Sequence, residues 1–252
     1  MKKLLAITAL SAALFFGQTA AAEEKAAEEV KPSHVEMVLV LDESGSMSNL
    51  TNDTIGGFNS MIEKEKKLDV DAHVTTVLFN DQYKMLYNRR ELKDVSKMTD
   101  KDYTPGGMTA LLDAVGRTIH KMDMVAGIHR KDKGNKVLFV IITDGEENDS
   151  KEYTYADVKK LIKDRQENAG WEFIFLGANI DAAAAAENLG IDRDRAVKYK
   201  NTGSGVRANF KAVAELSDSL AKSGRVSDEW KETVEKDEDD AADKQSAAVT
   251  LH

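Results

Sequence analysis

The sequence predicts an α/β domain with a mostly parallel β-sheet and helices on both faces. Short runs rich in β-branched and aromatic residues alternate with longer segments that carry apolar residues at helical spacing. Two of the runs, residues 35–41 (VEMVLVL) and 136–143 (KVLFVIIT), are almost continuously apolar, as expected of central strands covered on both faces. Both runs end in acidic loops, at Asp42 and at Asp144. Together these observations indicate a doubly wound α/β fold.

The first half of the domain is expected to contain a strand, a covering helix and a hairpin. The strand is residues 35–41, and residues 54–67 follow it with apolar side chains at helical spacing and charges on the other face. Residues 73–79 and 84–87 are β-rich and are separated by a short polar turn. We expect them to form a hairpin whose second strand is antiparallel and lies at an edge, which makes the sheet mixed.

The second half continues the alternation of helices and strands. A turn signal at residues 104–107 (TPGG) precedes a helix with apolar residues at Leu111, Leu112, Val115, Ile119 and Met122. The second central strand, residues 136–143, comes next. After it we expect helices at residues 154–168, 182–189 and 206–222, and strands at residues 172–176 and 196–199.

The composition is that of an acidic globular protein. The 252 residues are 42% hydrophobic and 31% charged, and the formal net charge is −9. Because no block of lysine and arginine supplies the positive surface that phosphate backbones require, no nucleic-acid partner is expected. The chain has no cysteine, which excludes disulfides, thiolate metal sites and cysteine nucleophiles. Any metal ion must therefore be bound by oxygen or imidazole.

The two ends of the chain differ from the domain in composition. Residues 1–22 combine two early lysines, a short apolar core and a final Ala20-Ala21-Ala22, which predicts a signal peptide cleaved after Ala22. The apolar core is shorter than the roughly 20 residues of a membrane span, so no integral span is expected after cleavage. We expect an exported protein, periplasmic or extracellular. Residues 23–32 are predicted to be a linker, residues 33–224 the domain, and residues 225–252 an acidic, disordered tail.

Side chains with oxygen donors gather where the two central strands end. The first strand is followed by Asp42, Ser44 and Ser46, the second by Asp144, and a loop containing Thr109 opens the helix that lies between them in sequence. In a doubly wound sheet, ligands bind beyond the carboxyl ends of the strands, where the strand order reverses. Oxygen donors without histidine or cysteine favour Mg²⁺, Mn²⁺ or Ca²⁺ over zinc. We predict a metal site, with Mg²⁺ as the first choice and Mn²⁺ or Ca²⁺ as alternatives.

At these residues the sequence resembles the von Willebrand factor A (VWA) domain with its metal-ion-dependent adhesion site (MIDAS). The motif of that family is Asp-x-Ser-x-Ser, a distant Thr and a later Asp, and it is filled by Asp42, Ser44, Ser46, Thr109 and Asp144. The surrounding segments LVLDESGSM, GGMTALLDA and VIITDGEEN are also similar to the family. Other stretches, such as WEFIFLGANIDA, resemble a bacterial branch of single-domain members.

The resemblance implies a six-stranded sheet of order 3-2-1-4-5-6, with one antiparallel edge strand and the metal ion between the first and fourth strands. Ser44, Ser46 and Thr109 are implied to bind the ion directly or through water, and Asp42 and Asp144 mainly through water or by holding the serine hydroxyls. Such an ion keeps excess positive charge and an exchangeable water, which an Asp or Glu of a partner protein can replace. The implied function is metal-dependent protein binding or adhesion, without enzymatic activity.

Two other functions stay open. An apolar strand ending in Asp, with a later Asp-Gly, is similar to haloacid dehalogenase phosphatases, which would make the protein a metal-dependent hydrolase. Those enzymes have a second Asp as general acid where this chain has Ser44, and a serine hydroxyl cannot do that acid's work. The third hypothesis is a scaffold that keeps the fold without a working metal site.

The remaining polar residues are given no site role. The acidic loop of residues 146–149 is expected to be mainly solvated, with a contribution to the metal site left open, and Asp113 is left unassigned. The segment Gly203-Ser204-Gly205 is expected to be a capped helix start and not a dinucleotide-binding loop. The five histidines are scattered along the chain and are assigned no ligand role: His34, His73, His120, His129 and His252.

Overall fold

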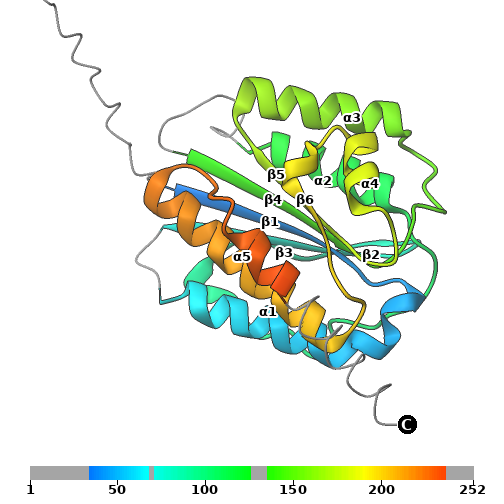
Figure 1. Cartoon of the computed structure of the whole chain (residues 1–252), viewed down its shortest axis with the longest axis horizontal. Coiled ribbons are helices and arrows are strands. Elements are labelled where there is room, and N and C mark those ends of the chain that lie inside the picture. Colours follow the sequence, from blue (N-terminus) through cyan, green and yellow to red (C-terminus); the bar gives the residue numbers. More distant parts are fainter. Residues whose placement is uncertain (1–33, 68–70, 126–134, 237–252) are drawn as a thin grey trace, which may run out of the picture.

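A six-stranded mixed sheet forms the centre of the domain (Figure 1). The structure is a computed structural model that describes residues 34–67, 71–125 and 135–236. The strand order is β3-β2-β1-β4-β5-β6. Strand β3 pairs antiparallel with β2 at one edge, and the other pairings among the described strands are parallel. The predicted fold class, strand order and antiparallel edge strand are confirmed.

The elements follow the predicted alternation. The strands are β1 (His34–Asp42), β2 (Ala72–Phe79), β3 (Tyr83–Glu91), β4 (Asn135–Thr143), β5 (Glu172–Gly177) and β6 (Ala196–Lys198). The helices are α1 (Thr51–Glu65), α2 (Leu111–Asp123), α3 (Tyr155–Asp164), α4 (Ala182–Leu189) and α5 (Gly203–Ser223). Among the helices of the described ranges, none combines the length and the apolar character that a membrane span needs.

Two apolar layers cover the sheet, one on each face (Figure 1). Helices α1 and α5 pack on one face, and α2, α3 and α4 pack on the other. Alternate residues of β1 point to opposite layers: Met37 and Leu39 to the first, Val38 and Val40 to the second. Because both faces of β1 are buried, its sequence is apolar at nearly every position, and full burial of each such side chain contributes about 1.5–3 kcal/mol.

Three helices differ from the prediction in their boundaries, and α1 begins and ends a few residues before the expected residues 54–67. The helix expected at residues 206–222 begins earlier, at Gly203, because the Thr202 side chain accepts a hydrogen bond from the backbone N–H of Gly205 (3.2 Å). The expected capped helix start is thereby confirmed. The helix expected at residues 154–168 ends at Asp164 and continues as a short π-helical turn, Arg165–Ala169, which stops at Gly170 in a left-handed conformation (φ 70°).

The domain continues beyond the predicted boundary at residue 224. Val226, Trp230 and Val234 are buried and belong to the apolar layer of α1 and α5, and residues 230–236 are helical. The prediction of a disordered tail from residue 225 is therefore wrong for residues 225–236. Its acidic composition conceals an apolar stripe, because Trp230 and Val234 lie four residues apart on one helix face. Residues 237–252 and the predicted signal peptide and linker at residues 1–32 lie outside the described residues.

Candidate metal centre

The candidate site lies at the carboxyl ends of β1 and β4, which are neighbours in the sheet. The chain leaves β1 toward β2 on one side, whereas β4 lies on the other side, so the strand order reverses here. Asp42 is the last residue of β1, and Asp144 directly follows the last residue of β4. The fold therefore brings two acidic loops together that are about one hundred residues apart in sequence.

Four of the five predicted site residues form one hydrogen-bonded network. The Ser44 backbone N–H donates to Asp42 Oδ1 (2.7 Å), and the hydroxyls of Ser44 and Ser46 are 3.0 Å apart. The Ser46 hydroxyl then donates to Asp144 Oδ1 (2.5 Å). Ser44 and both carboxylates are buried, whereas Ser46 is exposed. The network thus runs from the core to the surface and presents a serine hydroxyl at its outer end.

Thr109, the fifth predicted residue, lies beside the loop that contains Asp144. A Cβ atom placed on Gly145 would be 3.8 Å from the Thr109 hydroxyl. The backbone N–H of Thr109 donates to Asn148 Oδ1 (2.9 Å), and the N–H of Asn148 donates to the Thr109 carbonyl (3.0 Å). The Thr109 side chain is buried. The loop before α2 is therefore fastened to the loop after β4, with the threonine hydroxyl next to Gly145.

Backbone hydrogen bonds join the Thr109 loop to the loop after β1 as well. The N–H of Gly106 donates to the Glu43 carbonyl (2.9 Å), and the N–H of Gly45 donates to the Gly107 carbonyl (3.2 Å). Gly107 has a φ of 75°, and a Cβ atom there would lie 1.9 Å from Asp81 Oδ1. Only glycine fits this position, because both the left-handed conformation and the lack of space exclude a side chain. The three loops of the site form one braced unit.

Three further residues support the site, and sequence analysis assigned none of them. The Thr143 hydroxyl donates to Asp42 Oδ2 (2.6 Å), and the Tyr103 hydroxyl donates to the Asp42 carbonyl (2.6 Å). Asn201 donates from Nδ2 to Asp144 Oδ2 (3.1 Å). Thr143 precedes Asp144 directly and was the easiest to suspect, whereas Tyr103 and Asn201 lie in loops without a motif. These bonds leave each oxygen of both carboxylates with a protein donor.

The two carboxylates are buried without a positive partner. Asp42 is 1% and Asp144 is 2% exposed, and among the described residues neither forms an ion pair. Burial raises the pKa of Asp42 above its ordinary value, and the nearby charge of Asp144 adds to that rise, while hydrogen bonds from Ser44 and Thr143 oppose it. A divalent cation bound beside these two buried carboxyl groups and the serine hydroxyls would stabilise their ionised form. The all-oxygen donor set fits Mg²⁺, Mn²⁺ or Ca²⁺.

The acidic loop after β4 has a structural role at two of its positions. Glu147 accepts hydrogen bonds from the backbone N–H groups of Leu112, Asp149 and Ser150 (2.9, 3.0 and 2.7 Å). Asn148 holds Thr109 as described above. Asp113, left unassigned in sequence, accepts three backbone N–H bonds from residues 151–153 (each 2.9 Å), which lower its pKa against the opposing effect of burial. These acids therefore shape the loop beside the site.

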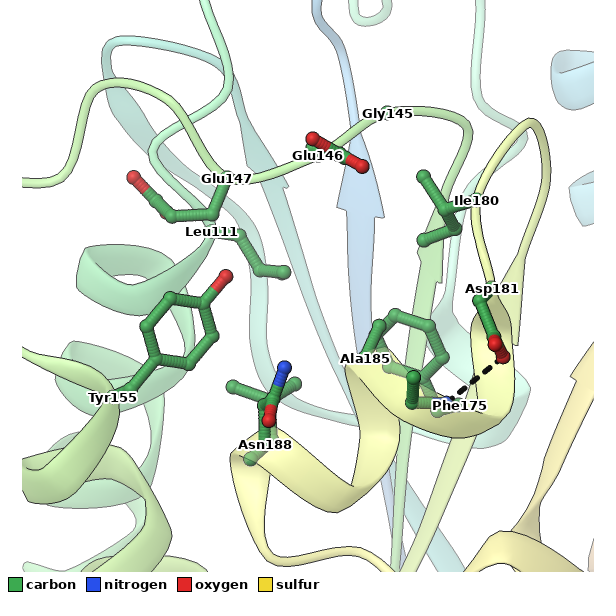
Figure 2. Close-up of a pocket in the computed structure, with 12 residues that line it drawn as sticks. Leu111, Gly145, Glu146, Glu147, Tyr155, Phe175, Ile180, Asp181, Ala185 and Asn188 are labelled. Atoms are coloured by element: carbon green, nitrogen blue, oxygen red, sulfur yellow. Dashed lines mark hydrogen bonds between the residues drawn. The ribbon is translucent and has the colours of Figure 1, made fainter.

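A pocket of about 280 Å³ opens next to the site on the side of α3 and α4 (Figure 2). Its rim includes Gly145, Glu146 and Glu147, the residues that follow Asp144. Figure 2 shows Tyr155 and Asn188 pointing toward the space between these two helices, below Glu146. The lining thus mixes carboxylates, an amide, a phenol and apolar side chains. Any group bound at the candidate site would have this pocket beside it.

Residues 34–193 match the vWA-TerF-like family, described as the vWA found in TerF C terminus. Comparison with curated proteins gives no match.

Three solved structures illustrate the likeness of the fold. A von Willebrand factor type A protein from Catenulispora acidiphila is 16% identical (TM-score 0.50), over 73% of this chain and 42% of that one. The vWF domain of the type V pili tip protein Mfa5 from Porphyromonas gingivalis is 12% identical, with a TM-score of 0.52. The match covers 78% of this chain and 99% of that domain's chain. Proximal thread matrix protein 1 from the mussel byssus, with a zinc occupied MIDAS motif, is 14% identical, with a TM-score of 0.50. The match covers 75% of this chain and 47% of that protein's chain.

The present chain spans less than half the length of the first and third of these structures. At such identities the likeness concerns the fold alone. The family match covers more than half of the chain and includes β1, β4 and the loops of the candidate site. The sheet order and the placement of acidic loops at the ends of β1 and β4 agree with it. The chain therefore belongs to the vWA-TerF-like family of VWA domains.

Proposed function

We propose that the protein binds a divalent cation through Asp42, Ser44, Ser46, Thr109 and Asp144, and through it a carboxylate of a partner protein. The observation that carries the proposal is the buried pair of carboxylates, linked by two serine hydroxyls and lacking a cation from the described part of the chain. Mg²⁺ is the ion we propose, with Mn²⁺ or Ca²⁺ as alternatives, because the donors are all oxygen.

The residues of the site divide into two roles in this proposal. Asp42 holds the Ser44 backbone N–H and Asp144 holds the Ser46 hydroxyl, and each oxygen of the two carboxylates already accepts a hydrogen bond from the protein. Ser44, Ser46 and Thr109 would offer neutral oxygens to the ion. A bound divalent ion supplies net positive charge and a coordination position that a foreign carboxylate can take. The exposure of Ser46 supports access from outside.

We propose a binding function and not hydrolysis. A hydrolase of the phosphatase type would need a general acid two residues after Asp42, and that residue is Ser44, whose hydroxyl lies 3.0 Å from the Ser46 hydroxyl. The positions of the hydroxyls favour coordination. Turnover of a generic phosphoester that is lost in an Asp42→Asn variant would contradict this part of the proposal.

We propose that the protein works outside the cytoplasm. The support is the leader-like sequence of residues 1–22, with its lysines, short apolar core and alanines before Glu23. The partner would then be a protein of the periplasm, the cell surface or the surroundings. Intact-mass measurement of the protein recovered from outside the cytoplasm tests this, because a mass that retains residues 1–22 would contradict cleavage.

The metal proposal is tested by melting curves of EDTA-stripped protein with and without added Mg²⁺ or Mn²⁺. At an ion concentration of 100 times the Kd, the folded state should gain about 2.7 kcal/mol, seen as a higher Tm. Ser46→Ala should lose this gain. Ser48→Ala is the matched control, because the Ser48 hydroxyl donates to the Gly45 carbonyl (2.7 Å) outside the network. An equal gain in Ser46→Ala and the parent protein would contradict the site.

The partner is sought by affinity capture from cell-envelope extracts, carried out in parallel with Mg²⁺ and with EDTA. A partner retained with Mg²⁺ and released by EDTA is expected, and Ser46→Ala should fail to retain it. Replacement of single acidic residues in the captured partner then identifies the carboxylate. Capture that is the same in both buffers would show a contact that does not depend on the ion.

A further inference from the structure

A second cluster of metal-binding side chains lies at the opposite end of the sheet. β1 and β2 are parallel and in register with Glu36 opposite His73, so residues 34, 36 and 73 come together where these strands begin. His34 and Glu36 are two residues apart and lie on the same face of β1. One ligand atom from each of the three residues lies within 4.8 Å of the other two. The two histidines are 39 residues apart in sequence and belong to no His-Glu-x-x-His arrangement, so the sequence alone assigns them no ligand role.

The three donor atoms form a compact triangle, one side of which already has the length of a tetrahedral zinc site, while the other two would lengthen by about 0.5 Å when an ion binds. His34 Nε2 is 2.8 Å from Glu36 Oε1 and 2.9 Å from His73 Nδ1, and His73 Nδ1 is 3.4 Å from Glu36 Oε1. The circle through these atoms has a radius of about 1.8 Å, so a point 2.0–2.1 Å from all three lies about 1 Å off their plane. Two imidazoles and one carboxylate are a known zinc ligand set. The oxygen-rich site at the other end contains no imidazole among its five proposed ligands.

Arg89 occupies the position of a cation in this cluster. Its guanidinium donates from Nε to Glu36 Oε1 (3.0 Å) and from Nη2 to the same oxygen, while Nη2 lies 3.2 Å from His73 Nδ1. The Arg89 side chain is about one third exposed, so it can swing into solvent. Glu36 is 1% exposed, and its Oε2 has no hydrogen-bond partner among the described residues. A buried carboxylate oxygen therefore stays unsatisfied even with the arginine in place.

Asp71 orients one of the histidines. Its Oδ2 lies 3.2 Å from His34 Nδ1, on the side of the imidazole away from Glu36. A carboxylate that accepts a proton from Nδ1 is the usual outer partner of a zinc-bound histidine. In the metal-free protein Nε2 faces Glu36 Oε1 (2.8 Å), and a bound ion would take the place of the proton between these two atoms. His34 and His73 are partly exposed, so an ion in solution can reach them.

We propose that His34, Glu36 and His73 form a second metal site, which takes Zn²⁺ or a similar transition ion in place of the Arg89 guanidinium. The site is separate from the MIDAS residues, since it lies at the amino ends of the strands and the MIDAS lies at their carboxyl ends. Asp71 positions His34. Arg89 is the resident cation, which neutralises Glu36 until the ion displaces it.

The test is zinc titration of the full chain against a chromogenic chelator, with millimolar Mg²⁺ present to occupy the oxygen-rich site. One zinc per chain is expected, with a Kd of about 1 µM or lower. His73→Gln should weaken binding by at least about 100-fold and Asp71→Asn by about tenfold. His120→Ala is the matched control, because His120 is exposed and lies beside Asp123, away from the cluster. Arg89→Gln should tighten binding by about tenfold, since the competing cation is gone.

Arg89→Gln keeps the proposal testable if His73→Gln fails to fold, because it predicts a gain and not a loss. Zinc binding that is equally tight in His73→Gln and His120→Ala, or absent from the parent protein, would overturn the second site. Ser46→Ala should leave zinc binding unchanged. Loss of zinc in Ser46→Ala would assign the ion to the MIDAS residues, contradicting the second site while leaving the first proposal intact.

Discussion

The two ends of the sheet contain buried carboxylates in opposite electrostatic surroundings. At the carboxyl ends of the strands, Asp42 and Asp144 are buried with hydroxyls and an amide, and no ion pair of the described residues involves them. At the amino ends, Glu36 is equally buried but is paired with Arg89 and hydrogen-bonded by His34. The same chemical group is therefore paired with a cation of the chain at one end and left without one at the other.

The electrostatic difference between the two ends shifts the pKa values of their carboxyl groups in opposite directions. Because Arg89 and His34 stabilise the ionised form, the pKa of Glu36 is lowered to about 2 against the opposing effect of burial. Burial instead raises the pKa of Asp42. A buried charge that the chain itself neutralises stabilises the fold, whereas one without a partner costs free energy until a cation arrives from outside. The uncompensated end is therefore where we place the Mg²⁺-dependent binding function, whereas a metal ion at the other end must first displace Arg89.

The largest expected effect comes from removing the resident cation. Arg89→Met leaves Glu36 buried without its permanent cation, with only the hydrogen bond from His34, and should lower the free energy of unfolding at pH 7 by about 3 kcal/mol in metal-free buffer. Arg193→Met is the matched control, because its ion pair with Glu187 is mostly exposed and should be worth less than about 1 kcal/mol. Urea denaturation curves of the two variants measure the difference.

The pH dependence of the Arg89→Met effect follows from the lowered pKa of Glu36. A carboxyl whose pKa is about 2 when folded and 4.5 when unfolded adds stability above pH 4.5 and loses it as the pH falls through 2. The gap between parent and Arg89→Met should therefore be full at pH 6 and should shrink below pH 4. A gap that does not change with pH would mean that Arg89 stabilises the fold by packing.

Another buried carboxylate, Glu65 at the end of α1, extends the comparison because its pH dependence has the opposite sign to that of Glu36. Burial raises its pKa to about 7, against a hydrogen bond from Ser217 (2.6 Å) and the charge of Lys64, while Asp218 adds to the rise. The folded state therefore loses stability as the pH rises from 4.5 to 7. Glu65→Gln should stabilise the protein by about 2 kcal/mol at pH 8 and leave it almost unchanged at pH 4. Thermal melting at the two pH values measures this, and equal shifts at both would contradict an ionised Glu65.

The fold was largely predictable because its signals are local. Residues 35–41 and 136–143 are apolar at nearly every position, and that pattern alone marks strands buried on both faces. The segment after residue 224 was missed because two apolar residues, Trp230 and Val234, stand among acidic ones and acquire meaning only when α1 and α5 provide a surface to cover. Composition describes the average of a segment, whereas burial depends on the spacing of a few residues.

The site residues likewise fall into those that a sequence motif identifies and those that only the packing of neighbouring elements brings together. Asp42, Ser44, Ser46 and Asp144 follow strand ends and belong to one motif, so the family resemblance could name them. Asn201 lies in a loop, and its bond to Asp144 depends on how β6 connects to α5. The pairing of His34 with His73 depends on the register of β1 and β2, which a hydrophobic pattern does not fix to one residue on parallel strands. What sequence cannot supply is the placement of side chains across neighbouring elements.

A smaller effect is expected from Thr143→Val, which removes the hydroxyl that donates to Asp42 Oδ2. The buried carboxylate loses one of its donors, so the free energy of unfolding should fall by about 1.5 kcal/mol. Thr76→Val is the control in the same sheet, because the buried Thr76 hydroxyl has no hydrogen-bond partner among the described residues. That change should be neutral or stabilising. Equal losses in the two variants would assign the effect to packing and not to Asp42.

The smallest effect on folding, and the most selective test of the carboxyl end, is expected from Asn201→Ala. Asn201 is exposed, so its removal should change the free energy of unfolding of the metal-free protein by less than about 0.5 kcal/mol. Its amide nevertheless donates to Asp144 Oδ2, and loss of such an outer partner typically weakens metal binding by about 10–100-fold. Titration of Mn²⁺ into Asn201→Ala should therefore show a Kd at least about tenfold higher than in Asn188→Ala, an exposed asparagine on the neighbouring pocket. Equal Kd values in the two variants would mean that Asp144 is positioned by Ser46 alone, and that the loop before α5 does not contribute to the site.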